Sequence, residues 1–227
     1  MKILARGEKS LIAELKQKLA AINCEITEVS DSDYPQIDLA QFNVIFDLSI
    51  DEQANTLKYY APLKNIPVFI GAVKKQLAEV VHHYGREMQC VLIGINDLPT
   101  FINRSLAEVS LYNSDNLAIL QTTMQNLSWD FKLVGDRVGL VTPRIIMMII
   151  NEACYTLQEG TATMQDIDTS MKLGTNYPFG PFEWADKIGI KHVYETLTAI
   201  YNDTHDERYK ICPLLKTTYL NNTSFYK

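Results

Sequence analysis

Positive charge, paired cysteines and long hydrophobic runs are all scarce in this sequence of 227 residues. Lys and Arg number 21 against 27 Asp and Glu, so the formal net charge is −6. Nucleic-acid binders need clustered Lys and Arg, and we therefore expect no nucleic-acid partner. The longest apolar run, residues 145–150, is far too short to cross a bilayer. The apolar run at the N-terminus is also too short for a signal peptide, so we expect no membrane partner.

Cysteine and histidine are equally sparse, with four of each. Cys24, Cys90, Cys154 and Cys212 are far apart, and no Cys-x-x-Cys pair indicates a zinc or redox site. We expect buried, inert thiols, no bound metal, and a reducing cytoplasm as the compartment. The adjacent pair His82-His83 closes a predicted helix, where cationic side chains complement the helix dipole. His192 and His205 have no second ligand at metal-binding spacing and are interpreted as surface residues.

The first part of the chain alternates short apolar runs with amphipathic segments. Leu11, Leu15 and Leu19 recur at helical spacing, with Ser10 placed to cap the helix start. Further helices are predicted at residues 52–61 and 74–83. The six predicted strands are residues 3–5, 24–29, 44–48, 68–72, 90–95 and 106–111. Strands that alternate with helices favour a doubly wound parallel sheet. Residues 30–42 leave no room for a full crossover helix, so one crossover is expected to be shortened.

After Gly139 the pattern changes to helices alone. Thr142-Pro143 is typical of a helix start, and the apolar residues 145–150 predict a helix that is buried on most faces and ends near Gly160. Thr163-x-x-Asp166 resembles a capping box for the next helix. A further amphipathic stripe is formed by Val193, Leu197, Ile200 and Tyr201. We therefore place the domain boundary between residues 135 and 142.

Residues 172–189 predict a helix end, a tight turn and a new helix. Gly174 stands where a glycine that ends a helix belongs. Pro181 suits a first helical position after Gly180, and Glu183 falls in the first turn, where the helix dipole favours a negative charge. Gly189 closes this short helix. From these residues alone, Glu183 and Asp186 are interpreted as helix-capping and packing residues.

This run closely resembles the helical C-terminal domain of the 3-hydroxyacyl-CoA dehydrogenase family. The family's Met-Lys-Leu-Gly, Pro, Gly-Pro-Phe-Glu, Asp and Gly stand here at residues 171–174, 178, 180–183, 186 and 189. Further matches are Arg144, Asn151, Glu152, Ala153, Asp166, Ile167 and Asp168. The resemblance implies a shortened Rossmann-like domain at residues 1–137 and a helical dimerisation domain at residues 138–227. It also implies NAD as cofactor, an acyl-CoA ligand and a homodimer.

The first turn departs from a dinucleotide-binding fingerprint. A Gly-rich turn after the first strand lets the pyrophosphate approach the backbone. Here Gly7 alone remains of that pattern, and Glu8 adds a negative charge beside the phosphate position. Glu28 follows Gly7 by 21 residues, an offset at which an acid binds ribose hydroxyls. Gly7 and Glu28 are thus the candidate cofactor residues, with a plain turn glycine and an exposed edge charge as the alternatives.

The catalytic positions are also altered. The family carries a catalytic His after the fifth strand and, 12 residues later, a Glu that orients it. Glu108 matches the orienting Glu, while Asn96 takes the place of the His. Imidazole accepts a proton near neutral pH and an amide does not, and a lost general base costs roughly 100- to 10,000-fold in rate. Asp97, one residue away, is a weak substitute because it faces the opposite side of an extended segment.

Two functions therefore remain open. The first is a catalytically impaired, dimeric binding or regulatory homologue of 3-hydroxyacyl-CoA dehydrogenase. The second is an active NAD-dependent dehydrogenase in which Glu108 and Asn96 position the substrate. The family's Ser-Ser pair after the fourth strand is also missing, since Val73-Lys74-Lys75 stands there. The absence of the glycines and of the histidine favours the first function.

Overall fold

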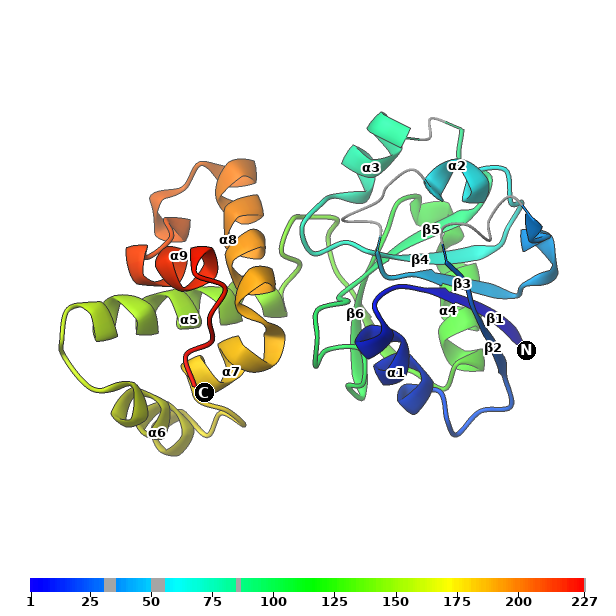
Figure 1. Ribbon diagram of the computed structural model, residues 1–227. Helices are drawn as coiled ribbons and strands as arrows, with labels where there is room; N and C mark the ends of the chain where they lie inside the picture. The colour runs from blue at the N-terminus through cyan, green and yellow to red at the C-terminus, as the bar shows by residue number, and fades with distance from the viewer. Residues whose placement is uncertain (31–35, 50–55, 85–86, 227) are drawn as a thin grey trace. The chain divides into compact units, whose positions relative to one another are not determined.

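The computed structural model describes residues 1–30, 36–49, 56–84 and 87–226 (Figure 1). The chain divides into two compact units, Met1–Leu140 and Val141–Lys227. The assignment of the two units as a dinucleotide-binding-type and a dehydrogenase C-terminal-type domain, with a boundary at residues 137/138, stays a prediction.

The first unit is built on a sheet of seven strands in the order β2-β1-β3-β4-β5-β6-β7. Their bounds are Lys2–Arg6 (β1), Glu25–Glu28 (β2), Val44–Asp47 (β3), Pro67–Gly71 (β4), Val91–Ile95 (β5), Leu106–Leu111 (β6) and Asp130–Leu133 (β7). The first five are mutually parallel, and β7 is parallel to β6. The predicted Rossmann-like α/β class is confirmed. Two details differ from the predicted sheet: β6 runs antiparallel to β5, and the seventh strand, β7, was not predicted.

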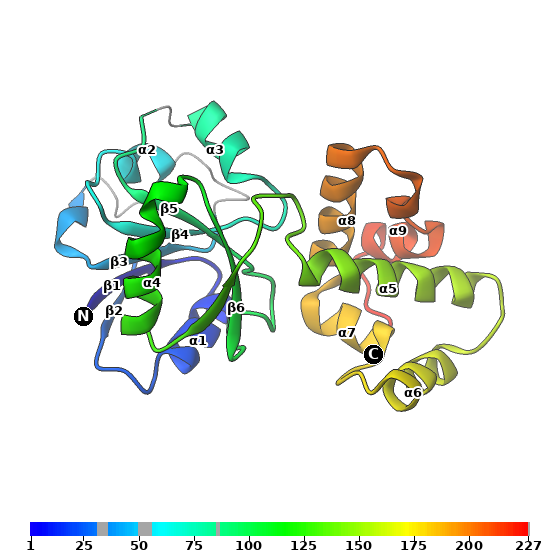
Figure 2. The same ribbon diagram turned by 180° about the vertical axis from the view of Figure 1, so that it is seen from behind.

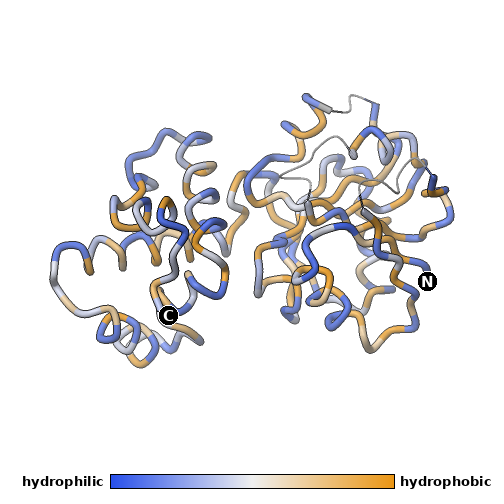
Figure 3. The backbone as a smooth tube through the Cα atoms, viewed as in Figure 1, coloured by the Kyte–Doolittle hydropathy of each residue, from blue (hydrophilic) through white to orange (hydrophobic). Residues whose placement is uncertain are grey.

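Helices cover both faces of this sheet (Figures 1 and 2). On one face α1 (Lys9–Lys18) and α4 (Leu117–Asn126) contribute buried leucines to a core that includes Phe46 and Phe69. On the other face α2 (Leu57–Tyr60) and α3 (Leu77–Tyr84) pack over the alternate strand residues. Figure 3 shows hydrophobic residues concentrated on the central strands. Strands buried on both faces read as continuous apolar runs, which is why β1, β3, β4 and β5 were recognisable in the sequence.

Several local expectations in this unit need correction. Helix α1 begins at Lys9 after the N-cap residue Glu8, so Ser10 lies inside the helix and does not cap it. Of the helix predicted at residues 52–61, the part up to residue 55 lies outside the described residues, and α2 is a single turn. The shortened crossover before β3 holds a 3₁₀ turn, Leu39–Gln41, in its described part. A second 3₁₀ turn, Ser114–Asn116, leads into α4, which was not predicted.

The second unit is all helical. Its elements are α5 (Thr142–Gln158), α6 (Met164–Thr175), α7 (Pro181–Ile188), α8 (Ile190–Thr204), the 3₁₀ turn Glu207–Tyr209 and α9 (Pro213–Leu220). Thr163 caps α6 as predicted, because its Oγ1 accepts from the Asp166 amide at 3.2 Å. Gly180 and Gly189 flank α7 as predicted, and Gly189 has a φ of +94°. Gly174 does not end α6. The helix continues to Thr175, and Asn176 ends it in the left-handed conformation, with a φ of +56°.

Helix α5 is buried on one side and exposed on another. It packs against α7, α8 and α9 through residues that include Met147, Ile150 and Cys154. Ile145 is nevertheless 55% exposed, and Met148 and Ile149 are half-buried. The expectation that an all-round apolar helix is buried on most faces is therefore wrong for the side that carries Ile145.

Candidate functional site

The order of the strands marks where a ligand site belongs in the first unit. After β1 the chain forms β2 on one side of β1, and it then crosses back to form β3 on the other side of β1. In open parallel sheets, ligands bind beyond the carboxyl ends of the two strands at which this order reverses. The residues that follow β1 and β3 therefore define the candidate site.

Gly7 forms the turn after β1 and is tightly constrained. Its φ is +155°, and a Cβ at this position would lie 2.9 Å from the Leu48 Cβ, just beyond β3. The glycine therefore has a packing role: it lets the segment after β3 close onto the turn after β1. Whether it also contacts a cofactor stays a prediction.

Beside this turn lies a buried ion pair that the sequence analysis missed. Arg6 ends β1 and Asp47 ends β3, in register with each other, and they are 3% and 0% exposed. Arg6 Nη1 donates to Asp47 Oδ1 at 2.7 Å. Asp47 Oδ2 accepts from Thr56 Oγ1 at 2.7 Å and from the Tyr60 hydroxyl at 2.9 Å. The carboxylate thus has a partner on each oxygen, as a buried charge requires.

The residues around this turn do not meet the needs of a dinucleotide. A pyrophosphate is held by open backbone N–H groups and a helix N-terminus that lacks opposing charge. Here the exposed Glu8 is the N-cap residue of α1, and the Arg6 guanidinium already bonds to Asp47. The turn carries a negative charge where the phosphates need positive potential. The residues described after β1 and β3 do not form a phosphate cradle.

Glu28, the candidate ribose ligand, ends β2 next to Ala5 of β1. Its carboxylate makes an ion pair with Lys16 of α1, and each side chain is 47% exposed. A ribose would have to compete with Lys16 for this carboxylate. The geometry is that of an exposed charge at the edge of the sheet, and the cofactor role stays a prediction.

Asn96 and Glu108, the candidate catalytic pair, are neighbours: Asn96 directly follows β5 and Glu108 lies on β6. The Asn96 amide N donates to the Glu108 carbonyl O at 3.2 Å, just past the end of the antiparallel ladder. The Asn96 side chain is 5% exposed, and its Oδ1 is 3.4 Å from the Leu98 amide N. The structure therefore brings the two predicted residues together through their backbones.

Asp97 is turned back into the unit. It is 7% exposed, and a Cβ on Gly71, at the end of β4, would lie 2.0 Å from Asp97 Oδ2. The carboxylate thus rests on the backbone of β4 and requires a glycine there. This placement gives Asp97 a packing role at the carboxyl edge of the sheet.

Arg104 is a further charged residue near Glu108. Its guanidinium lies 3.8 Å from the centre of the Phe101 ring, and its Nε donates to the Thr100 carbonyl O at 3.2 Å. Burial lowers the pKa of Arg104, while the charges of Glu108 and Glu14 raise it. Thr100, a β-branched residue, has a φ of +76°, and its amide donates to Glu14 Oε1 at 2.9 Å. Nothing in the hydrophilic stretch 103–105 of the sequence indicated that Arg104 would be partly buried near Glu108.

The residues of the C-terminal pattern hold the helical unit together. Asp168 is 3% exposed and accepts from the amides of Phe182 at 2.9 Å and Glu183 at 3.1 Å, so it caps α7. Glu183 pairs with Lys172 at 3.3 Å. Asn151 donates to the Lys210 carbonyl O at 2.9 Å and accepts from the Cys212 amide at 2.8 Å. These contacts agree with the capping and packing role expected for Glu183.

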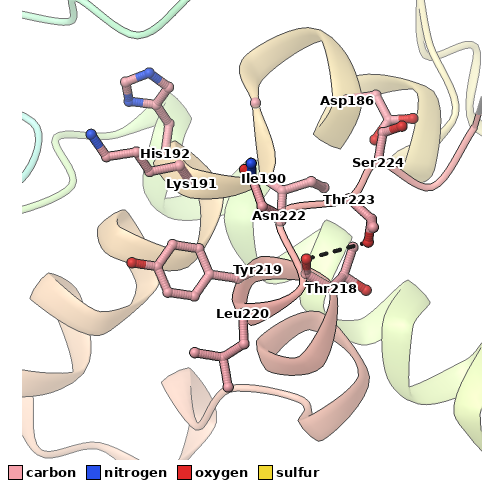
Figure 4. A pocket seen from close by; sticks show the side chains of 11 residues that line it. Asp186, Ile190, Lys191, His192, Thr218, Tyr219, Leu220, Asn222, Thr223 and Ser224 are labelled. Carbon is pink, nitrogen blue, oxygen red and sulfur yellow. Dashed lines mark hydrogen bonds between the residues drawn. The ribbon is translucent and has the colours of Figure 1, made fainter.

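An open groove of about 780 Å³ lies beside α8 and the end of α9 (Figure 4). Its lining includes Lys191, His192 and several hydroxyls. Thr218 Oγ1 donates to the Leu214 carbonyl O and Thr223 Oγ1 to the Thr218 carbonyl O, so both hydroxyl protons are already used. In Figure 4 the Lys191 and His192 side chains extend away from the threonines. The groove therefore does not gather its donors on one ligand position.

The cysteines of the described residues provide no reactive or metal-binding site. Burial raises the pKa of Cys90 to about 12 and that of Cys154 further, so both stay protonated thiols near neutral pH. Across the described ranges, no three His, Cys, Asp or Glu side chains gather closely enough to hold a metal ion. Within those same ranges, every helix is too short or too polar to cross a membrane.

Comparison with known proteins identifies the helical unit. Residues 139–224 match the family described as 3-hydroxyacyl-CoA dehydrogenase, C-terminal domain. This unit belongs to the 3-hydroxyacyl-CoA dehydrogenase family. The chain is 42% identical over 83 residues to the 3-hydroxyadipyl-CoA dehydrogenase of Escherichia coli, covering 37% of this chain and 18% of that protein. It is 40% identical over 83 residues to a probable 3-hydroxybutyryl-CoA dehydrogenase of Bacillus subtilis, covering 37% of this chain and 29% of that protein. The match thus spans less than a third of either relative.

The fold extends the likeness over both units. The structure of (S)-3-hydroxybutyryl-CoA dehydrogenase from Ralstonia eutropha aligns with a TM-score of 0.75 at 19% identity, covering 97% of this chain and 93% of that one. At this identity the alignment shows a shared fold, a Rossmann-like sheet unit followed by a helical unit. It does not transfer the activity, because function depends on the site residues.

Proposed function

We propose that this chain is a 3-hydroxyacyl-CoA dehydrogenase-like protein of acyl-CoA metabolism that is catalytically impaired. It acts as a dimeric binding or regulatory homologue, with an acyl-CoA as candidate ligand and the cytoplasm as its compartment. The likeness of the helical unit to dehydrogenases that act on 3-hydroxyacyl-CoA thioesters supports the metabolic class. The residues of the first unit support the loss of activity.

One observation carries the proposal: the residue whose backbone pairs with that of Glu108 is Asn96, which has a side-chain amide where a dehydrogenase needs an imidazole. Oxidation of a 3-hydroxyacyl group removes the hydroxyl proton while hydride leaves the same carbon. A carboxylate next to an imidazole orients that base and stabilises its charged form. An amide accepts no proton near neutral pH, so the Glu108 carboxylate has no base to orient.

The first test is a turnover assay with (S)-3-hydroxybutyryl-CoA and NAD, followed by absorbance of NADH. We expect the rate to stay below about 0.1 per second, which is a 100-fold loss from an ordinary turnover number near 10 per second. Asn96→His is the matching variant and Asn103→His, at an exposed position in the next loop, is its control. Neither is expected to reach an ordinary rate, because the turn after β1 stays unchanged. A wild-type rate of several turnovers per second would instead support the active dehydrogenase.

The dimer is proposed from the exposed side of α5. Val141 and Ile145 are 46% and 55% exposed, and Met148 and Ile149, which continue the same stripe at helical spacing, are half-buried. Apolar side chains that repeat along one helix face are typical of permanent interfaces. A two-fold axis crossing α5 would bury this stripe against the same stripe of a second copy.

A further inference from the structure

Residues 224–226 lie on the helical unit through an unusual pair of backbone contacts. The amides of Phe225 and Tyr226 donate to the two oxygens of Asp186, at 2.9 Å and 2.7 Å. One carboxylate thus holds two consecutive peptide N–H groups. Hydrogen bonds to an ionised acceptor are about twice as strong as neutral ones.

The two aromatic side chains add specific contacts. The Phe225 ring packs edge-on against Phe182, with the ring centres 4.7 Å apart, and Phe182 is fully buried. The Tyr226 hydroxyl donates to Asp168 Oδ2 at 2.8 Å. A segment with two adjacent aromatic residues is therefore bound by three residues, Asp168, Phe182 and Asp186. We call these three residues the tail socket.

The tail socket is held in shape by α7 and not only by the segment on it. Asp168 also accepts from two amides in the first turn of α7, at 2.9 Å and 3.1 Å. A Cβ on Gly180 would lie 2.2 Å from the Asp168 Cγ, so the glycine lets the carboxylate reach that turn. A site that keeps its geometry without its occupant binds with a smaller ordering cost.

The segment is attached to the unit through a short hinge. The amides of Asn222 and Thr223 donate to the carbonyls of Tyr219 and Thr218, at 3.0 Å and 3.2 Å, and so remain with the end of α9. Only Ser224 separates these anchored residues from Phe225. The aromatic pair can leave the tail socket by rotation about Ser224 while α9 stays intact.

Hollows adjoin the docked segment on both sides. Beside Tyr226 is a hollow of about 330 Å³ lined by Gln165, Thr169, Lys172 and Glu183 in addition to Asp168. On the other side is the larger groove, where Asp186, Thr223 and Ser224 lie close together (Figure 4). A longer peptide with the same aromatic pair would make contacts in both hollows that residues 224–226 do not make.

We propose that the tail socket is a peptide-binding site, occupied in this structure by residues 224–226, and that an extended segment with two adjacent aromatic residues from a partner protein displaces them. The site goes beyond the dehydrogenase-like function, and it does not depend on that function or on the dimer. An attached segment competes at an effective concentration in the millimolar range. To displace the attached segment, a partner peptide therefore needs the added contacts in the two hollows.

The test uses a fluorescent hexapeptide with the sequence of residues 222–227, followed by fluorescence anisotropy. Wild-type protein is compared with the released variant Phe225→Ser/Tyr226→Ser and with the same variant carrying Asp186→Asn. Glu159→Gln in the released variant is the control, because Glu159 is exposed at the end of α5. We expect saturable binding to the released variant, at least roughly tenfold weaker binding to wild type, and a loss of roughly tenfold or more with Asp186→Asn. The control should bind like the released variant.

A released variant with native circular dichroism that does not bind the hexapeptide at roughly 1 mM, the effective concentration of an attached segment, would overturn the proposal. If the released variant does not fold, amide hydrogen exchange in the wild type decides. We expect the Phe225 and Tyr226 amides to exchange at least roughly 100-fold faster than the Trp184 amide of α7, through local opening. Equal rates would mean that the segment leaves only on global unfolding and would overturn the proposal.

Discussion

Arg6 Nη1 lies 2.7 Å from Asp47 Oδ1, and the pair joins the carboxyl ends of β1 and β3. These are the two strands between which the order of the sheet reverses. In a dinucleotide-binding sheet that position is left to the cofactor. Here the chain places its own cation and anion there, and the hydroxyls of Thr56 and Tyr60 donate to the Asp47 carboxylate.

Arg6→Ala should be among the most destabilising substitutions in the first unit. It leaves the Asp47 carboxylate buried without its charge partner, and breaking such a pair costs about 3–5 kcal/mol. Replacing both partners by apolar residues, Arg6→Met/Asp47→Leu, should cost less than the single change. Urea unfolding followed by circular dichroism measures both effects. Lys16→Ala, which breaks the exposed pair with Glu28, is the control and should cost at most about 1 kcal/mol. Similar losses for Arg6→Ala and Lys16→Ala would contradict the structural role of the buried pair.

Much of the fold was predictable because buried parallel strands are continuous apolar runs. Val44–Asp47 and Val91–Ile95 are clear examples. β7 was missed because Asp130–Leu133 is an edge strand with three exposed residues, so its pattern carries little burial signal. The Asn96–Glu108 pairing followed from the family spacing. The Arg6–Asp47 pair was missed because it depends on which strands are neighbours, and that order is not local in the sequence.

Substitution by alanine should change the stability of the protein in opposite directions at Gly71 and at Gly174. A Cβ at Gly71 would lie 2.0 Å from Asp97 Oδ2, while nothing lies within 4 Å of one at Gly174. Gly71→Ala should therefore cost about 1–3 kcal/mol by overpacking. Gly174→Ala, inside α6, should stabilise the helical unit by up to about 1 kcal/mol. Thermal unfolding checks both signs, and a stabilised Gly71→Ala would disprove the close approach of Asp97.

The environment of the Tyr226 hydroxyl leads us to predict a loss of stability at alkaline pH. Burial raises the pKa of Tyr226, and its hydrogen bond to Asp168 and the charges of Asp168, Glu183 and Asp186 raise it further. A raised pKa in the folded state means that the stabilisation is complete below the ordinary value near 10 and is lost as the pH rises above it. Wild type should thus lose stability above pH ~10 more steeply than Tyr226→Phe. Urea unfolding from pH 7 to 11 measures the difference, and parallel curves would argue against a phenol held by Asp168.

Assembly is predicted to depend on α5. Light scattering should report about twice the chain mass of 25.8 kDa. Ile145→Glu places a charge in the exposed apolar stripe and should yield monomers, because an interface core tolerates unpaired charge poorly. Glu159→Gln is the matched control and should leave the mass unchanged. Wild-type protein that is monomeric at tens of micromolar, a concentration at which permanent interfaces of standard size stay associated, would contradict the dimer.

The most direct measurement for the account as a whole is calorimetric titration of the protein with NADH. The turn at Gly7 is closed by Leu48, Glu8 stands at the N-terminus of α1, and Arg6 is bonded to Asp47. We therefore predict no saturable heat at micromolar NADH, because the turn offers no cradle for a pyrophosphate. A dissociation constant for NADH in the low micromolar range would contradict this prediction and would instead support a dehydrogenase that binds its cofactor.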